Sequence, residues 1–461
     1  MPPQASVTEP SAAAAALEDA RRRTLRLVEG ITDEDLERVH SPLMSPLAWD
    51  LGHIAAFEDL WLVHRLGGEP MLREDLGHVY DAFETPRSDR GDLPFLRAPE
   101  ARAYLEEVRE HALAALRSAD ADADGSTIPE LVIRHEHQHQ ETMLQSLQLA
   151  RLEGYEGPGR EEPPWSPSER HTGLETVAVP AGAFPLGAGA DGFAYDNELP
   201  RHTVELAAFR IGAAPITNGT WMRFADGGGY ERREWWSDEA WRWKEEYDIT
   251  LPGGWTDDGR EWRMGRLEPL HPSRPVVHVS WFEADAFARA HGVRLPTEAE
   301  WEKAATWDQR TESKRTWPWG KEPPGAAQAA VRHLTLGGGR GLPGSEGSGA
   351  RPAQRQHANL DARVYGTAPV GSYPAGASPC GALAMVGDVW EWTAGELRGY
   401  PGFVAHPYPE YSEVFFGTEH KVLRGGSWAS AGRVALPTFR NWDLPARRQI
   451  FAGVRIAQDG A

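Results

Sequence analysis

The spacing of apolar residues divides this chain of 461 residues into two parts of different kinds. Up to residue 152, apolar side chains recur at intervals of three and four positions with few glycines between them, which is typical of helices that bury one face. Four segments show this pattern: 13–30, 42–66, 98–118 and 127–152. They predict a bundle of helices that pack side by side around one core.

A stretch rich in Pro, Gly and charge, EGYEGPGREEPPWSPSERHT at 153–172, interrupts this pattern. Beyond it, short strand-like pieces such as HTVELAAFRIG dominate. Helical stretches are fewer there: TNGTWMRFADGGG, SWFEADAFARAHG and PTEAEWEKAAT, the last with a possible capping box of Thr297 and Glu300. The chain is too long for one ordinary core. We therefore expect a helical bundle over 12–155, a linker over 156–172 and an α+β domain over 173–461.

Charge and cysteine content exclude several classes of function. The 68 acidic and 48 basic residues leave a net charge of −20, which argues against nucleic acid or an anionic membrane as a partner. Small-molecule substrates remain possible, and no apolar run of 18 or more residues suggests a membrane span. The only cysteine, Cys380, allows neither an intrachain disulfide nor a cysteine-based metal site. These features favour a cytoplasmic protein.

The segment RHEHQHQETM at 134–143 predicts a metal site. On a helix, His135 and His139 share one face about one turn apart, so both imidazoles can bind one ion, whereas His137 must point elsewhere. The best candidate for a third ligand is His53, on the second helical segment. Three neutral imidazoles without a carboxylate suit zinc, iron or copper, and their spacing does not choose among these metals. The alternative for each histidine is an ordinary place in a core or on a surface.

Several motifs resemble known families. Residues 42–61 and 134–149 resemble the DinB-like metal-binding bundle. From about residue 176 onward, VPAGAFPLG, PITNGTWMRFADGGGY, GDVWEWTAG, VLRGGSW and FAGVRIA resemble the formylglycine-generating-enzyme (sulfatase-modifying-factor) fold, a C-type-lectin-like architecture. The two domains in this order, with RNWD at 440–443, resemble the sulfoxide synthases of ergothioneine biosynthesis. The implied fold class is a multidomain one: a DinB-like four-helix bundle followed by a C-type-lectin-like domain.

The resemblance implies a non-haem iron(II), O2-dependent enzyme. It would join the sulfur of γ-glutamylcysteine to C2 of the imidazole of hercynine, a trimethylated histidine, giving γ-glutamyl-hercynylcysteine S-oxide. The residues that match the family's iron ligands are His53, His135 and His139. Those that match its hercynine pocket are Gln138, Asn441 and Trp442. Those that match its contacts to γ-glutamylcysteine are Arg87, Arg90, Asp443 and Arg447.

The chemistry of these residue types agrees with the roles implied. Arg87 and Arg90, three residues apart, can form charge-assisted bidentate contacts to carboxylates, although a solvated arginine pair is the alternative. Asp443 near Arg447 could be a simple ion pair of little energetic consequence. Trp442 could contribute a cation–π contact to the quaternary ammonium of hercynine, or merely pack.

The family's catalytic tyrosine belongs in the loop GELRGYPGFVAHPYPEYSEVFFGTEH, where it would supply a proton that steers the reaction toward sulfoxide formation. Tyr400 and Tyr408 are both candidates, Tyr411 is a more distant one, and we prefer Tyr400. An aromatic side chain that only closes the pocket is the alternative for each.

Two other functions stay open. Relatives that use free cysteine or a selenium donor share the scaffold, and a zinc-dependent thiol transferase with a lectin-like binding module belongs to a different class. Formylglycine-generating enzymes act through cysteines, and with only Cys380 this chain cannot use dithiol chemistry.

Overall fold

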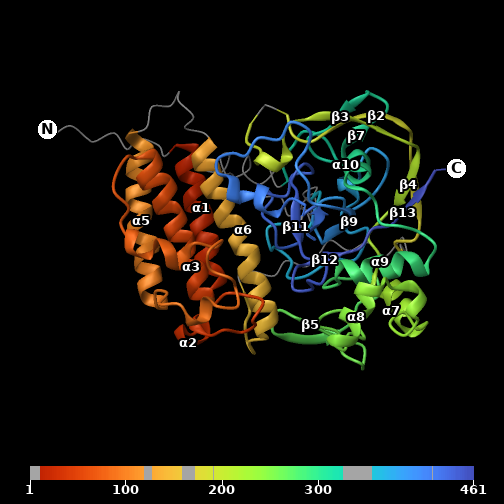
Figure 1. Cartoon of the computed structure of the whole chain (residues 1–461), viewed down its shortest axis with the longest axis horizontal. Helices are drawn as coiled ribbons and strands as arrows, with labels where there is room; N and C mark the ends of the chain where they lie inside the picture. Colours follow the sequence, from red (N-terminus) through yellow and green to blue (C-terminus); the bar gives the residue numbers. More distant parts are fainter. Residues whose placement is uncertain are drawn as a thin grey trace, which may run out of the picture. The chain divides into compact units, whose positions relative to one another are not determined.

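The computed structural model describes residues 11–118, 127–157, 172–189, 192–324, 356–417 and 419–460 (Figure 1). The chain forms two compact units. The first comprises Met1–Arg160, Ala190–Phe193 and Trp262–Glu268, and the second comprises Glu161–Gly189, Ala194–Glu261 and Pro269–Ala461. Most of the predicted linker 156–172 lies outside the described residues, so the domain boundaries stay a prediction.

The first unit is a helical bundle, built from α1 (Ala12–Leu27), α3 (Leu47–Glu58), α5 (Ala98–Ser118) and α6 (Thr127–Ala150). Three of these helices fall within the segments predicted from apolar spacing, and α1 begins one residue before its predicted segment 13–30. Helix α1 begins after Ser11, whose side chain accepts a hydrogen bond from the Ala14 N–H. Helix α3 packs against α5 and α6, and α1 packs against α6 (Figure 1).

The second helical segment does not stay α-helical to its end. Helix α3 gives way at Asp59 to η1 (Asp59–Leu66), which has the wider hydrogen bonding of a π-helix, a form often found near functional sites. The buried Asp59 carboxylate accepts from the N–H groups of Leu72 and Arg73 and from the Tyr104 hydroxyl, which fixes the chain that follows. The short helix α2 (Asp33–Glu37) lies between α1 and α3 in the chain. The 67–97 connection contains three short elements: η2 (Glu74–Leu76), α4 (Gly77–Tyr80) and η3 (Arg90–Asp92).

Four charged side chains meet inside the bundle, one from each main helix: Arg21, Glu58, Arg109 and Glu136. We call them the buried charge tetrad. Both arginines contact both glutamates, with the closest N···O distances between 2.6 and 3.2 Å, and all four side chains are buried. Two positive charges thus balance two negative ones away from water, where an unpaired ion would be very costly.

The second unit contains two larger sheets. An antiparallel sheet has the order β1 (Thr176–Val179), β4 (Phe209–Gly212), β13 (Ala457–Asp459). A mixed sheet has the order β11 (Asn441–Asp443), β10 (Lys421–Arg424), β9 (Trp390–Glu396), β12 (Ala452–Gly453), with β12 parallel to β9. Two further strand pairs lie in this unit: β2 (Gly182–Leu186) with β3 (His202–Leu206), and β7 (Trp307–Asp308) with β8 (Ser313–Lys314). The pair of β5 (Arg260–Arg263) with β6 (Arg266–Pro269) belongs mostly to the first unit.

Four helices of eight or more residues are described in the second unit: α7 (Asn218–Asp226), α8 (Asp238–Glu246), α9 (Trp281–Ala290) and α10 (Glu298–Thr306). Short 3-10 turns are η4 (Asp196–Glu198), η5 (Arg233–Trp235), η6 (Pro374–Gly376), η7 (Pro409–Tyr411) and η8 (Glu413–Phe415). The predicted capping box of Thr297 and Glu300 is confirmed at the start of α10. Helix α8 was not predicted. Trp301 of α10 lies in the main core of this unit with Ile211 and Met385.

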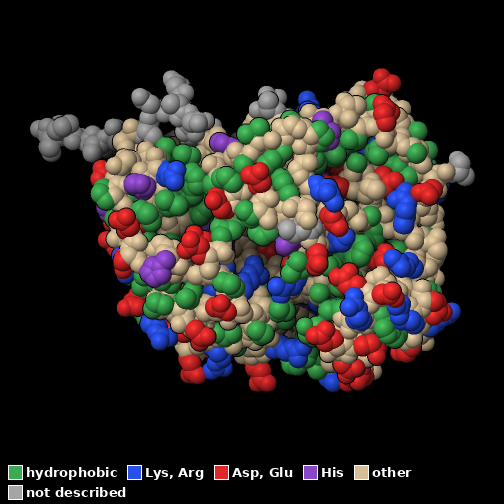
Figure 2. All heavy atoms as spheres, viewed as in Figure 1, with side chains coloured by type: hydrophobic (Ala, Val, Ile, Leu, Met, Phe, Trp, Pro, Cys, Tyr) green, Lys and Arg blue, Asp and Glu red, His purple; other side chains and the backbone are tan. Residues whose placement is uncertain are grey.

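The distribution of surface charge and the apolarity of the helices bear on the kinds of partner that the protein can bind. Acidic and basic side chains are mixed on the face drawn in Figure 2, so the net negative charge is spread over this face rather than gathered in one patch. Within the described ranges, none of the helices combines the length and the apolarity needed to cross a membrane.

Candidate metal centre

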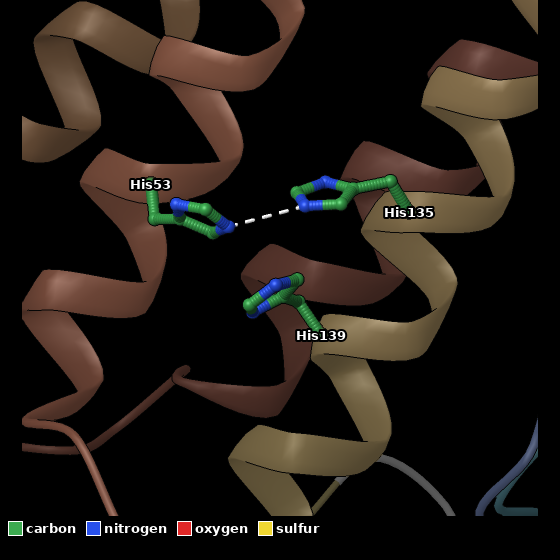
Figure 3. A group of neighbouring side chains, drawn as sticks. All are labelled: His53, His135 and His139. Atoms are coloured by element: carbon green, nitrogen blue, oxygen red, sulfur yellow. Dashed lines mark hydrogen bonds between the residues drawn. The ribbon is translucent and has the colours of Figure 1, made fainter. Parts of the chain in front are cut away.

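Three histidines from two helices of the first unit face one another (Figure 3). His53 comes from α3, and His135 and His139 come from α6, where their spacing puts them on one face. One ligand atom from each can be chosen so that all lie within 4.8 Å of one another, and the Nε2 atoms of His53 and His135 are 3.1 Å apart. Two nitrogens roughly 2.1 Å from one metal ion and at right angles lie about 3 Å apart. The geometry therefore fits neighbouring positions around a single ion.

Two of the rings are held by neutral groups. The Nδ1 atom of His53 donates to the Tyr80 carbonyl oxygen at 2.7 Å, and the ring stacks on Trp49 with 4.8 Å between centroids. Because a carbonyl can only accept, Nδ1 carries the proton, and the Nε2 lone pair is free for a metal. The ring of His135 stacks on Phe57 at 3.7 Å.

The third ring has an anionic partner. The Nδ1 atom of His139 lies 3.1 Å from Oδ1 of Asp50, a fully buried carboxylate in the first turn of α3. The same reasoning leaves Nε2 of His139 as the free nitrogen, because an ionised carboxylate can only accept.

The charge state of the rings suits metal binding. Burial, followed by the neighbouring His139, lowers the pKa of His53 and of His135 well below the usual range. Both are therefore neutral imidazoles at ordinary pH, which is the form that binds a metal. The set fits a divalent ion that takes nitrogen ligands, such as zinc, iron or copper. That these histidines bind a metal stays a prediction.

His137 lies apart from this group, as its place in the helix predicts. Its Nδ1 atom is 3.0 Å from the side-chain oxygen of Gln140, and Gln140 donates to the Ala20 carbonyl of α1. The buried ring therefore belongs to the interface between α1 and α6. Gln138, which lies between His137 and His139 on α6, is half-buried.

Arg87 and Arg90, both in the first unit, have no ion-pair partner among the described residues. Arg90 is only 5% exposed, lies 3.9 Å above the Trp49 ring, and donates to Ser45 and to the carbonyls of Thr85 and Ala82. Burial, followed by the charge of Arg87, lowers the pKa of Arg90 to about 10. The alternative of a solvated arginine pair on the surface is thus wrong for Arg90. An anionic ligand bound beside it would offset the free-energy cost of burying its charge.

In the second unit, the last three residues of RNWD form the edge strand β11. The alternation along a strand puts Asn441 and Asp443 on one side and Trp442 on the other. Asp443 accepts from Gln449 at 3.0 Å and lies 3.7 Å from the partly exposed Arg447. The Trp442 ring packs in an aromatic cluster, defined here as Tyr195, Tyr408, Tyr411, Phe415 and Trp442.

The two candidate tyrosines have different surroundings. Tyr400 is buried in a core cluster with Phe184 and Leu186, its hydroxyl lies 3.4 Å from the Glu298 carboxylate, and Arg440 lies over its ring. Burial, followed by the charge of Glu298, raises the pKa of Tyr400. Tyr408 is partly exposed at the edge of the aromatic cluster. These surroundings favour a packing role for Tyr400 and leave Tyr408 as the more accessible candidate, although the assignment stays a prediction.

The most informative residue that the sequence analysis missed is Asp50. It precedes His53 by three residues on the same helix, and this spacing puts the two side chains on one face, so a carboxylate near the ligands could have been inferred. Trp49 and Phe57 lie four residues before and four residues after His53, so the same helical spacing could have placed their rings near the ligands.

Family models match both parts of the chain. Residues 16–143 match the DinB superfamily, and residues 162–460 match the sulfatase-modifying factor enzyme 1-like domain. The predicted fold class, a DinB-like helical bundle followed by a C-type-lectin-like formylglycine-generating-enzyme fold, is confirmed by these matches.

Individual relatives extend over nearly the whole chain. A hercynine oxygenase from Mycolicibacterium thermoresistibile is 46% identical over 451 residues, covering 96% of this chain and 93% of that relative. A hercynine oxygenase from Mycobacterium tuberculosis is 44% identical over 478 residues, covering 98% of this chain and 100% of that relative. Among solved structures, PvdO from Pseudomonas aeruginosa is similar with a TM-score of 0.39 and 23% identity, over 62% of this chain and 94% of PvdO.

Proposed function

We propose, because the chain belongs to the family of hercynine oxygenases, that this oxygenase joins the sulfur of γ-glutamylcysteine to C2 of the hercynine imidazole at a non-haem iron(II) centre. The product would be γ-glutamyl-hercynylcysteine S-oxide, on the route to ergothioneine. In the balanced reaction the thiol and the imidazole each lose one hydrogen. One oxygen atom of O2 enters the sulfoxide, and the other leaves as water.

The observation that carries the proposal is the convergence of three imidazoles from α3 and α6, two of them with Nδ1 directed at an acceptor. Such a set supplies three ligands and no charge. Iron(II) bound there would keep open positions for the thiol sulfur and for O2, and would favour the deprotonated thiol.

The remaining candidate residues would bind and orient the substrates. Arg87 and Arg90, which form no ion pair with the described residues, suit the carboxylates of γ-glutamylcysteine, which would let a strongly acidic protein bind an acidic peptide. In the second unit, Asp443 and Arg447 would distinguish the peptide from free cysteine. Gln138, Asn441 and Trp442 would hold hercynine, and fixing its C2 against the sulfur would lower the barrier through proximity.

The aromatic cluster gives the proposed role of Trp442 a physical basis. Trp442 lies edge to face with Tyr411 at 5.9 Å and packs against Phe415 at 5.4 Å. Rings that are fixed in this way lose little freedom when a quaternary ammonium binds against their faces.

The proposal is tested by purifying the protein without oxygen and loading separate samples with iron(II) or zinc(II). Hercynine, γ-glutamylcysteine and O2 are then added, and products are identified by mass spectrometry. We expect the coupled sulfoxide from the iron sample alone, with one O2 consumed per product. A zinc sample that transfers thiols while the iron sample forms no sulfoxide would instead support a thiol transferase. Competition among γ-glutamylcysteine, free cysteine and selenium analogues identifies the donor.

Tyr408→Phe is expected to lower the rate of sulfoxide formation by roughly 100-fold or more, as the loss of a positioned proton donor does, and to increase plain thiol oxidation. Tyr400→Phe is expected mainly to lower the free energy of unfolding, by about 1 kcal/mol. The loss is small because Glu298 keeps its hydrogen bonds from Arg424 and Arg440. The measurement is the ratio of coupled to uncoupled product together with the melting temperature. A changed ratio in Tyr400→Phe alone would make Tyr400 the proton donor.

A further inference from the structure

The three rings of the candidate metal centre are not held equivalently. His53 donates to a carbonyl oxygen and His135 stacks on a phenyl ring, whereas His139 contacts a carboxylate. Among the described residues, Asp50 is the one acidic side chain in hydrogen-bond contact with any of the three histidines. His139 is therefore the one ring of the three whose hydrogen-bond partner, among the described residues, is a carboxylate.

Burying the Asp50 carboxylate costs free energy of folding, so its contact with His139 calls for a functional reason. The residue is 0% exposed, and its second oxygen, Oδ2, has no hydrogen-bond partner within the described part of the chain. A buried carboxylate with one oxygen unsatisfied loses free energy relative to water. Its place in the first turn of α3, through the helix dipole, and the nearby positive charge of Arg90 offset part of this cost. Neither accounts for the hydrogen-bond contact with His139.

We propose that Asp50 is a positioning residue of the metal centre, which holds His139 in the tautomer with Nε2 free and makes this nitrogen a stronger ligand. The inference rests on the proposed metal-binding function. A carboxylate that accepts from Nδ1–H fixes the ring's orientation and raises the basicity of the other nitrogen. It also places one negative charge next to a set of three neutral ligands, where it offsets part of the charge of a divalent ion.

The test uses cobalt(II) as the probe, because its visible absorption reports ligand geometry without any turnover. The Kd of the anaerobic full-length protein for cobalt(II) is measured by competition with a chelator. We expect Asp50→Asn and Asp50→Ala to raise this Kd by roughly 10–100-fold, as the loss of outer hydrogen-bond partners does. In the zinc-loaded protein, long-range proton–nitrogen NMR should show a proton on Nδ1 of His139 in the unaltered chain and a weakened or lost Nδ1–H in Asp50→Ala.

Asp59→Asn is the matched control. Asp59 is equally buried, lies just beyond the end of α3, and accepts from Leu72, Arg73 and Tyr104 rather than from a histidine. It should lose stability while keeping the cobalt(II) Kd of the unaltered chain, measured where all variants are folded.

The outcomes separate this inference from the proposed function. Unchanged cobalt(II) affinity in Asp50→Asn, or an equal loss in Asp59→Asn, would overturn the role of Asp50. An unaltered chain that binds neither cobalt(II) nor iron(II) would contradict the metal centre itself. If Asp50→Ala does not fold, the nearly isosteric Asp50→Asn decides the question alone.

Discussion

His139→Ala is expected to abolish stable iron(II) binding and, with it, all oxygen-dependent activity. Two imidazoles would remain, and the loss of a ligand should exceed the roughly 10–100-fold loss of affinity caused by removing an outer partner. The substitution would also leave Asp50 buried with neither of its oxygens paired among the described residues. The measurement is the iron content per folded chain after anaerobic loading and desalting, followed by product formation.

His137→Ala is the control for this prediction, since it removes an imidazole from the same helix. Its ring contacts Gln140 and faces α1 rather than the centre, so iron binding should be retained. The substitution should instead lower the free energy of unfolding by about 1–3 kcal/mol, because Gln140 loses a hydrogen-bond partner in a buried interface. Equal loss of iron in the two variants would show that the ligand assignment is wrong.

Arg109→Ala is expected to destabilise the bundle by about 3–5 kcal/mol, the range for removing one partner of a buried ion pair. Arg109 contacts Glu58 twice, at 2.6 and 3.0 Å, and Glu136 at 3.2 Å, and it also donates to the Leu17 carbonyl of α1. Without it, two buried carboxylates would share the single charge of Arg21. The measurement is urea unfolding followed by the helical circular dichroism signal.

Arg102→Ala provides the comparison on the same helix. Arg102 pairs with Asp33 at 2.9 Å, but the two side chains are 35% and 50% exposed. An exposed pair of this kind contributes about 0–1 kcal/mol, and the difference should shrink further at high salt. Similar losses in Arg102→Ala and Arg109→Ala would mean that the buried charge tetrad adds no more than a surface pair does.

Much of the bundle could be predicted because its signals are local. Apolar spacing located all four main helices, and the spacing of His135 and His139 placed both on one face, with His137 elsewhere. His53 was found through its place on a second helix. The buried charge tetrad could not be found in this way, because Arg21 and Glu136 are 115 residues apart and either could equally lie on a surface.

The second unit was harder to predict because its contacts are mostly distant in sequence. Strand β1 pairs with β4 and β4 with β13, which joins the start of the unit to the end of the chain. The surroundings of Tyr400 depend on Glu298, 102 residues before it, and on Arg440, 40 residues after it, so nothing near Tyr400 in the sequence indicates its burial. Only the resemblance to a family predicts a role for RNWD and the tyrosine loop in a site.

The buried charge tetrad has a consequence for how a metal ion would reach the three histidines. Glu136 directly follows His135, and Glu58 lies five residues after His53, so the ion pairs that join the four helices also hold the ligand-bearing turns. If these contacts order the turns without a metal, we expect folding and metal binding to be separate events. The chain would then be folded before any ion binds. Which ion fills the site would depend on the supply of free metal as well as on affinity.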